Sequence, residues 1–168
     1  ANIELGQIGL PDIQRPFVWE NTKVRDLLDS MYRGYPVGHL LLWASGVEPG
    51  ARQIGDGGRQ VAPQLLIVDG QQRLTSLYAV MKGEPVIGTD YKSRQIRIAF
   101  KPQDEFFAVA DAATERDPAF LKNVTDIWTR STYTVINETI TAMRDAGVIS
   151  AQDELEKVAA ALNRLANL

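Results

Sequence analysis

The sequence predicts an α+β fold in which helices cover a small mixed β-sheet. Two patterns indicate this class. Apolar residues recur at helical spacing in several stretches, and short apolar runs bounded by glycine or proline are typical of strands. The 168 residues are 45% hydrophobic and 23% charged, which is enough apolar material for one domain with a core and argues against wholesale disorder.

The expected helices are marked by caps, glycine stops and apolar stripes. The first begins with Asn21 or Thr22 as its cap and ends at Gly34 and Pro36, and the second ends at Gly83. Two more cover 132–146 and 151–168, the last with Ser150 and Asp153 as a capping box. The four stripes are Val24, Leu27, Leu28 and Met31; Leu74, Leu77, Tyr78 and Met81; Ile136, Ile140 and Met143; and Leu155, Val158, Leu162 and Leu165.

Strands are expected where apolar runs are short. Residues 39–43 and 65–68 predict buried strands, and 94–100 predicts a strand with Ile96, Ile98 and Phe100 inward. Residues 3–18 read as extended chain and 44–63 as a long loop with a possible hairpin at Asp56-Gly57. The mixed stretch 104–126 has room for a short helix at 118–122. Trp43 and Trp128 are assigned to packing, and Trp19 to packing rather than base stacking.

Composition excludes several classes of function. There is no cysteine and one histidine, His39, so disulfide scaffolds and multi-histidine metal sites are ruled out. Without an apolar run near 20 residues or a signal peptide, we expect a cytoplasmic protein with no membrane contact. The net charge of −3 predicts that any DNA binding is weak and salt-sensitive. The absent initiator methionine and the stripe running to the last residue lead us to expect a fragment of a longer protein.

The strongest local signal is an apolar run followed by Asp69-Gly70-Gln71-Gln72-Arg73 and a helix. A helix N-terminus attracts anions, a glycine lets main chain approach phosphate, and an arginine offers a planar donor fork. A carboxylate such as that of Asp69 can hold Mg²⁺, and glutamine amides can orient a water or a nucleobase edge. The alternative is structural: Asp69 caps the helix, Gly70 makes a tight turn, and Arg73 pairs with a surface carboxylate.

Three further features are weaker. Gln14 and Arg15 lie in a proline-stiffened apolar segment, where Arg15 either faces a ligand or pairs with Asp12 or Asp69. His39 is a possible general base, although a lone histidine is more often a surface residue. A basic cluster, namely Lys92, Arg94 and Arg97, is a solvated strand face or a nucleic-acid contact.

Three motifs together resemble the GmrSD-type N-terminal domain family of bacterial restriction and phage-defence proteins. They are the run 10–19 (LPDIQRPFVW), the run 34–43 containing Gly-Tyr-Pro-Val-Gly, and the run 68–77 (VDGQQRLTSL). The match spans residues 3 to about 100, and position 39, often a small hydroxyl residue in the family, is histidine here. The resemblance implies a ParB/sulfiredoxin-like fold for residues 1–128, followed by a helical extension over 129–168.

The resemblance also implies a function. The domain would bind and hydrolyse a nucleoside triphosphate with Mg²⁺ and control a His-Asn-His nuclease domain in the same or a partner chain. It assigns catalysis to Asp69, Gln72 and Arg73, with the metal on Asp69, and nucleotide binding to Gln14, Arg15, Gly70, Gln71 and Arg73. Nuclease activity is not expected in this chain. The alternatives are a DNA-binding module that senses modified DNA with little catalysis, and a scaffold that docks other domains.

Overall fold

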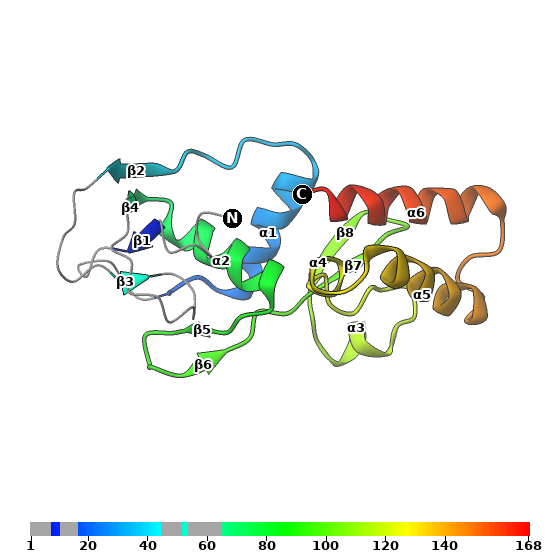
Figure 1. Cartoon of the computed structure of the whole chain (residues 1–168). Helices are drawn as coiled ribbons and strands as arrows, with labels where there is room; N and C mark the ends of the chain where they lie inside the picture. The colour runs from blue at the N-terminus through cyan, green and yellow to red at the C-terminus, as the bar shows by residue number, and fades with distance from the viewer. Residues whose placement is uncertain (1–7, 11–16, 45–51, 54–64) are drawn as a thin grey trace.

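The computed structural model of the protein describes residues 8–10, 17–44, 52–53 and 65–168 (Figure 1). Their helices and small sheets confirm the predicted α+β class. The predictions at Gln14, Arg15 and Asp56-Gly57 lie outside the described residues. No described helix has the length and apolar character needed to cross a membrane.

A four-stranded mixed sheet lies at one end of the molecule (Figure 1). Strand β4 (Leu65–Asp69) runs parallel to β1 (Ile8–Leu10) and antiparallel to β2 (Leu41–Ala44), and β3 (Arg52–Gln53) pairs with β1, giving the order β2-β4-β1-β3. The inner strand β4 buries Leu66 and Ile67, as predicted, but Val68, also predicted to be buried, is 49% exposed.

A strand does form near the predicted range 39–43, but the prediction that it is buried was wrong. Strand β2 is at the edge of the sheet, and Leu41 and Trp43 are 56% and 60% exposed. The assignment of Trp43 to packing was therefore also wrong, because most of its side chain is exposed. Trp19 and Trp128 are half-buried and pack against the core, as expected.

Helix α1 (Asn21–Tyr32) buries Val24, Leu27 and Leu28 as predicted, but Tyr32 rather than Met31 ends the buried side. Its N-cap is Glu20, not Asn21 or Thr22, and no side chain makes a capping hydrogen bond.

Helix α2 (Gln71–Lys82) ends at Gly83 as predicted. Its buried positions are Ser76, Ala79 and Val80, whereas the predicted stripe is only half-buried. Because α2 packs against both α1 and α4, small residues face the closest approach and the longer side chains lie to either side.

The predicted strand 94–100 is divided in two. Strands β5 (Val86–Ile87) and β6 (Ser93–Arg94) form one hairpin, and β7 (Ile98–Lys101) forms another with β8 (Phe106–Val109). Ile96, Ile98 and Phe100 are buried, as the alternation predicted.

The predicted helix at 118–122 was wrong. Leu121 instead exchanges main-chain hydrogen bonds with Phe100, which excludes a helical conformation there. Helices occur on either side of it: α3 (Ala112–Arg116), whose start is capped by the Asp111 carboxylate, and α4 (Asp126–Thr129).

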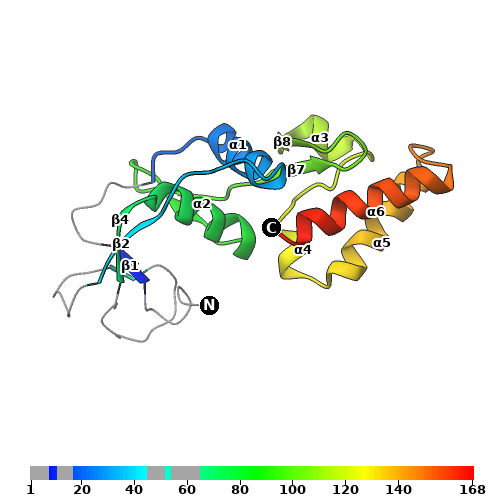
Figure 2. The ribbon, with the colours of Figure 1, turned by 90° about the horizontal axis from the view of Figure 1, so that it is seen from above.

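Helices α5 (Thr132–Asp145) and α6 (Gln152–Ala166) lie side by side, away from the β1–β4 sheet (Figure 2). Both predicted stripes face the core, with Met143, Val158, Leu162 and Leu165 fully buried. The predicted capping box used the wrong acid. Glu154, not Asp153, accepts hydrogen bonds from the main-chain N–H groups of Ser150 and Ala151.

One hydrophobic core joins α1, the β7–β8 hairpin and α6. Tyr32 of α1 packs on Phe100 and Phe107 of the β7–β8 hairpin, with ring centroids 5.3 and 5.6 Å away, and the same core contains Val158 and Leu162 of α6. The core thus includes residues from both sides of position 128. The division into 1–128 and 129–168 stays a prediction.

Candidate functional site

The candidate site is the turn between β4 and α2. Gly70 is the N-cap of α2 and has a φ of +89°, in the left-handed region that glycine adopts without strain. A Cβ at this position would overlap the side chain of Leu40. Because the cap is a glycine, it has no side chain to hydrogen-bond the start of the helix, and the first turn holds no acidic residue.

Arg73 is held by main chain from another part of the molecule. Its Nη1 donates to the main-chain oxygen of Val37 at 2.6 Å, and its Nη2 donates to that of His39 at 2.8 Å. Nη2 also donates to Asp69 Oδ2 at 3.1 Å. Gly38, between the two carbonyls, has a φ of +84°, and a Cβ there would overlap the guanidinium. Arg73 therefore fixes the segment 37–39 against α2.

Gln72 makes a second link. Its Oε1 accepts a hydrogen bond from the main-chain N–H of Val18 at 3.0 Å, while its own main-chain oxygen accepts one from Ser76 Oγ. The turn therefore joins three stretches of chain that are far apart in sequence: the approach to α1, the approach to β2, and the start of α2.

The Asp69 side chain is 73% exposed, whereas that of Arg73 is 19% exposed. The described residues contain no group of three or more acidic or histidine side chains placed to hold a metal ion. A single carboxylate beside an open helix start fits Mg²⁺ that arrives with phosphate oxygens, which is how proteins often hold this ion. The turn can thus offer one metal ligand and helix N–H dipoles to an anion.

His39 is exposed, in agreement with the surface alternative, and its use as a general base stays a prediction. Its main-chain oxygen, not its ring, is what contacts the motif. The sequence did not indicate that Val37 and Gly38 contact Arg73. The one pattern that marked this segment was the Gly-Tyr-Pro-Val-Gly run. The positions of Gln14 and Arg15 relative to the turn stay predictions.

The basic cluster is largely neutralised. Arg94 pairs with Asp90 at 2.9 Å, and Arg97 pairs with Glu115. These partners agree with a solvated surface better than with a nucleic-acid contact.

The fold and this turn define a class of protein: an α+β domain in which a strand leads through Asp-Gly-Gln-Gln-Arg into a helix, with the Asp69 carboxylate exposed at the junction. The chain belongs to the family of GmrSD restriction endonuclease N-terminal domains, whose family model matches residues 1–162. The match continues well past residue 100 and includes α5 and most of α6. The chain is thus an N-terminal domain of the restriction and phage-defence type.

A curated relative adds a second comparison. An uncharacterized protein of Methanocaldococcus jannaschii is 33% identical over 82 residues, which is 44% of this chain and 14% of that protein's length. The chain thus spans about one seventh of that relative. No solved structure matches the chain.

Proposed function

We propose that the β4–α2 turn binds a nucleoside triphosphate with Mg²⁺ and hydrolyses it, and that the state of this site controls a nuclease domain in the same or a partner chain. The observation that carries the proposal is the left-handed Gly70 between an exposed carboxylate and a helix start that no side chain caps. An anionic ligand is stabilised at such a helix start, because main-chain N–H groups and the helix dipole face it.

The roles of the motif residues follow from their contacts. Asp69 is the exposed carboxylate that would hold the metal, whose chemistry when bound is to offset phosphate charge. Gly70 and Gln71 bring main chain to the phosphates. Arg73 acts first as a positioning residue, since three of its N–H groups already have acceptors, and an arginine has five.

Gln72 also positions. By holding Val18 it fixes the chain that follows Gln14 and Arg15, which the proposal assigns to the nucleotide. The proposal also includes a ParB/sulfiredoxin-like fold for the domain and a catalytic role for Gln72.

The experiment is phosphate release from ATP, GTP, CTP and UTP with and without Mg²⁺. Arg73→Ala should lower turnover by about 10² or more, on the scale of losing one preorganised group. Arg73→Lys should be similarly impaired, because an ammonium cannot span two carbonyls as a planar fork does. Asp69→Asn should remove the Mg²⁺ dependence together with activity.

Arg130→Ala is the matched control, because Arg130 is an exposed arginine paired with Glu138 away from the turn. It should leave turnover unchanged. If folded Arg73→Ala protein hydrolyses nucleotide at the parental rate, or if no nucleotide binds the parent, the proposal fails. DNA sensing by this domain remains a second candidate, and the pairing of Arg94 and Arg97 gives it no support.

A further inference from the structure

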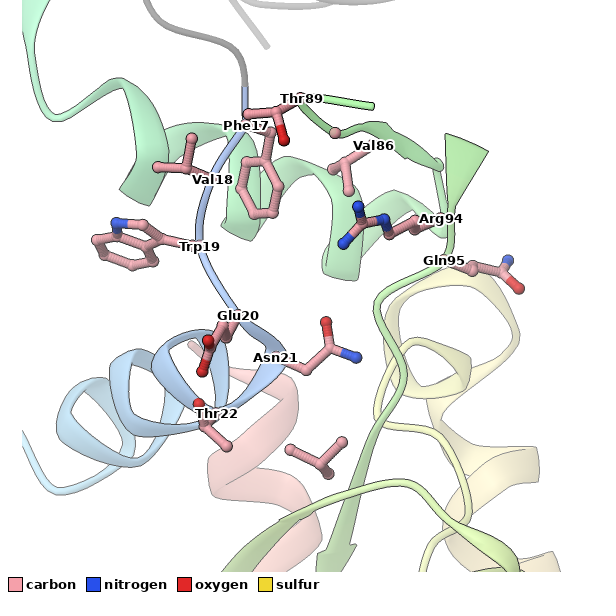
Figure 3. Close-up of a pocket in the computed structure, with 12 residues that line it drawn as sticks. Phe17, Val18, Trp19, Glu20, Asn21, Thr22, Val86, Thr89, Arg94 and Gln95 are labelled. Atoms are coloured by element: carbon pink, nitrogen blue, oxygen red, sulfur yellow. The ribbon is translucent and has the colours of Figure 1, made fainter. Parts of the chain in front are cut away.

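An open cavity of about 670 Å³ lies between the approach to α1 and the β5–β6 hairpin (Figure 3). This volume is in the range of pockets that hold small molecules. The residues of the Asp69–Arg73 turn are not among those that line it. Its walls are Phe17, Val18, Trp19, Glu20, Asn21, Thr22, Val86, Gly88, Thr89, Arg94, Gln95 and Val109.

One part of the cavity is apolar. Val86 is 6% exposed, Phe17 and Val109 are half-buried, and Phe17 belongs to the layer packed against the core. A main-chain bridge between Phe17 and Gly88 ties the two walls together. This part offers a ring face and aliphatic surface to an apolar group.

The opposite part carries one cation, Arg94. Figure 3 shows the Arg94 guanidinium turned toward the space beside the Phe17 ring, with the oxygen of the Asn21 amide facing the same space. Asn21 begins α1, whose N-cap residue is Glu20 and whose first turn holds no acidic residue. The helix dipole is positive at this end. The Glu20 carboxylate lines the rim, and in Figure 3 it points away from Arg94.

Arg94 is available to a ligand. Its partner Asp90 does not line the cavity, and the side chains of the two residues are 61% and 42% exposed. An exposed ion pair of this kind contributes little, because water screens it. An anion in the cavity can therefore take the place of Asp90 or share the guanidinium with it.

We propose that this cavity is a binding site for a small organic anion, separate from the β4–α2 turn. The ring or aliphatic body of the ligand lies against Phe17 and Val86. Its carboxylate, sulfonate or phosphate group contacts Arg94 and the start of α1. The two sites are linked by Val18, which lines the cavity and donates its main-chain N–H to Gln72.

Two fluorescent probes of nearly the same shape test the proposal on the full chain. They are 1-anilinonaphthalene-8-sulfonate, an aromatic anion, and N-phenyl-1-naphthylamine, which lacks the sulfonate. The sulfonate probe should bind one saturable site. Arg94→Gln should weaken it about tenfold, the value expected from losing one charge-assisted hydrogen bond, and should leave the uncharged probe unchanged.

Two further variants sharpen the result. Asp90→Asn should tighten sulfonate binding, because it releases Arg94 from its partner, so the two members of one ion pair have opposite effects. Arg97→Gln is the matched control, since Arg97 is also exposed and paired but does not line the cavity. It should change nothing, and circular dichroism should show every variant folded.

The proposal is overturned if Arg94→Gln and Arg97→Gln bind the sulfonate probe equally well, or if no saturable site exists. Sulfonate-probe binding that Asp69→Asn alters and Arg94→Gln does not would also overturn it, because the probe would then lie at the nucleotide site. A failure of nucleotide binding leaves the probe result standing, so the two proposals fail independently.

Discussion

The guanidinium of Arg73 donates to the main-chain oxygen of Val37 at 2.6 Å, across 36 positions of sequence. The bond passes beside Gly38, whose left-handed conformation turns the carbonyls of Val37 and His39 toward the same side chain. Three of the N–H groups of Arg73 are therefore used in contacts within the protein. Arg73 thereby holds the segment 37–39 beside the candidate site.

Gly38→Ala should destabilise the protein more than Gly34→Ala. Both glycines have positive φ, at +84° and +73°, so both variants have a conformational cost of about 1–2 kcal/mol. Only the Gly38 variant also places a Cβ on the Arg73 guanidinium, since nothing lies within 4 Å of a Cβ at Gly34. Urea unfolding of the two variants measures the difference.

The Arg73→Ala background provides the control. With the guanidinium removed, Gly38→Ala and Gly34→Ala should cost nearly the same. If the difference between the two alanine variants persists without the Arg73 side chain, another contact causes it and the proposed steric conflict is wrong.

The sequence predicted the location of this junction and, in the structural alternative, the pairing of Arg73 with a surface carboxylate, but it did not predict the main-chain contacts. An apolar run, Asp-Gly and a helical stripe are local patterns, and the structure confirmed strand β4, the turn and α2. The partners of Arg73 and Gln72 are main-chain atoms of Val37, His39 and Val18, and main-chain atoms are the same at every position. No side-chain pattern can indicate which carbonyl or N–H a distant segment will present.

Burial in the sheet was harder to predict for a related reason. Residues 39–43 and 65–68 have the same apolar character, yet only β4 is an inner strand. Strand order depends on pairing between distant segments, and a short apolar run fits an edge as well as a centre. Strand β8 was missed because Phe106–Val109 has neither a strict alternation nor a glycine boundary.

Trp43→Ala should have a small effect on stability, below about 1 kcal/mol, because the side chain is 60% exposed. Phe107→Ala, in contrast, should cost about 3–5 kcal/mol, because Phe107 is 1% exposed and its ring lies 4.6 Å from that of Phe100. Thermal and urea unfolding compare the two. An equal loss of stability would show that Trp43 is covered in solution.

Leu162→Ala should destabilise the whole domain by about 2–5 kcal/mol, because Leu162 is fully buried in the core that also contains α1 and the β7–β8 hairpin. Asn163→Ala is its neighbour control on the exposed side of α6 and should cost far less. The expected result is that the Leu162→Ala variant unfolds in a single transition in which the whole domain, including α5 and α6, is destabilised together. If α5 and α6 melt separately while the rest keeps its parental stability, they form an independent unit.

Tyr32 gives a prediction about pH. Its hydroxyl donates to Glu105 Oε1 at 2.9 Å, and the same oxygen accepts from Arg164 Nη1 at 3.1 Å. Burial, and then the hydrogen bond to the Glu105 carboxylate, raises the pKa of Tyr32 well above its usual value near 10. The folded state thus holds the phenol proton more tightly than the unfolded state does.

The sign follows from proton linkage. A raised pKa contributes stability that is fully present below the unfolded value near pH 10 and is lost as the pH rises toward the folded value. At pH 8, Tyr32→Phe should be less stable than the parent by about 1–2 kcal/mol, since a bond to a charged acceptor is lost. Above pH 10 the parent should lose this advantage, so the gap should narrow. Urea unfolding from pH 8 to 11 measures it, with Tyr133→Phe as the control because Tyr133 is 78% exposed. A gap between parent and Tyr32→Phe that stays constant over this range would mean that the Tyr32–Glu105 bond does not set the alkaline stability of the domain.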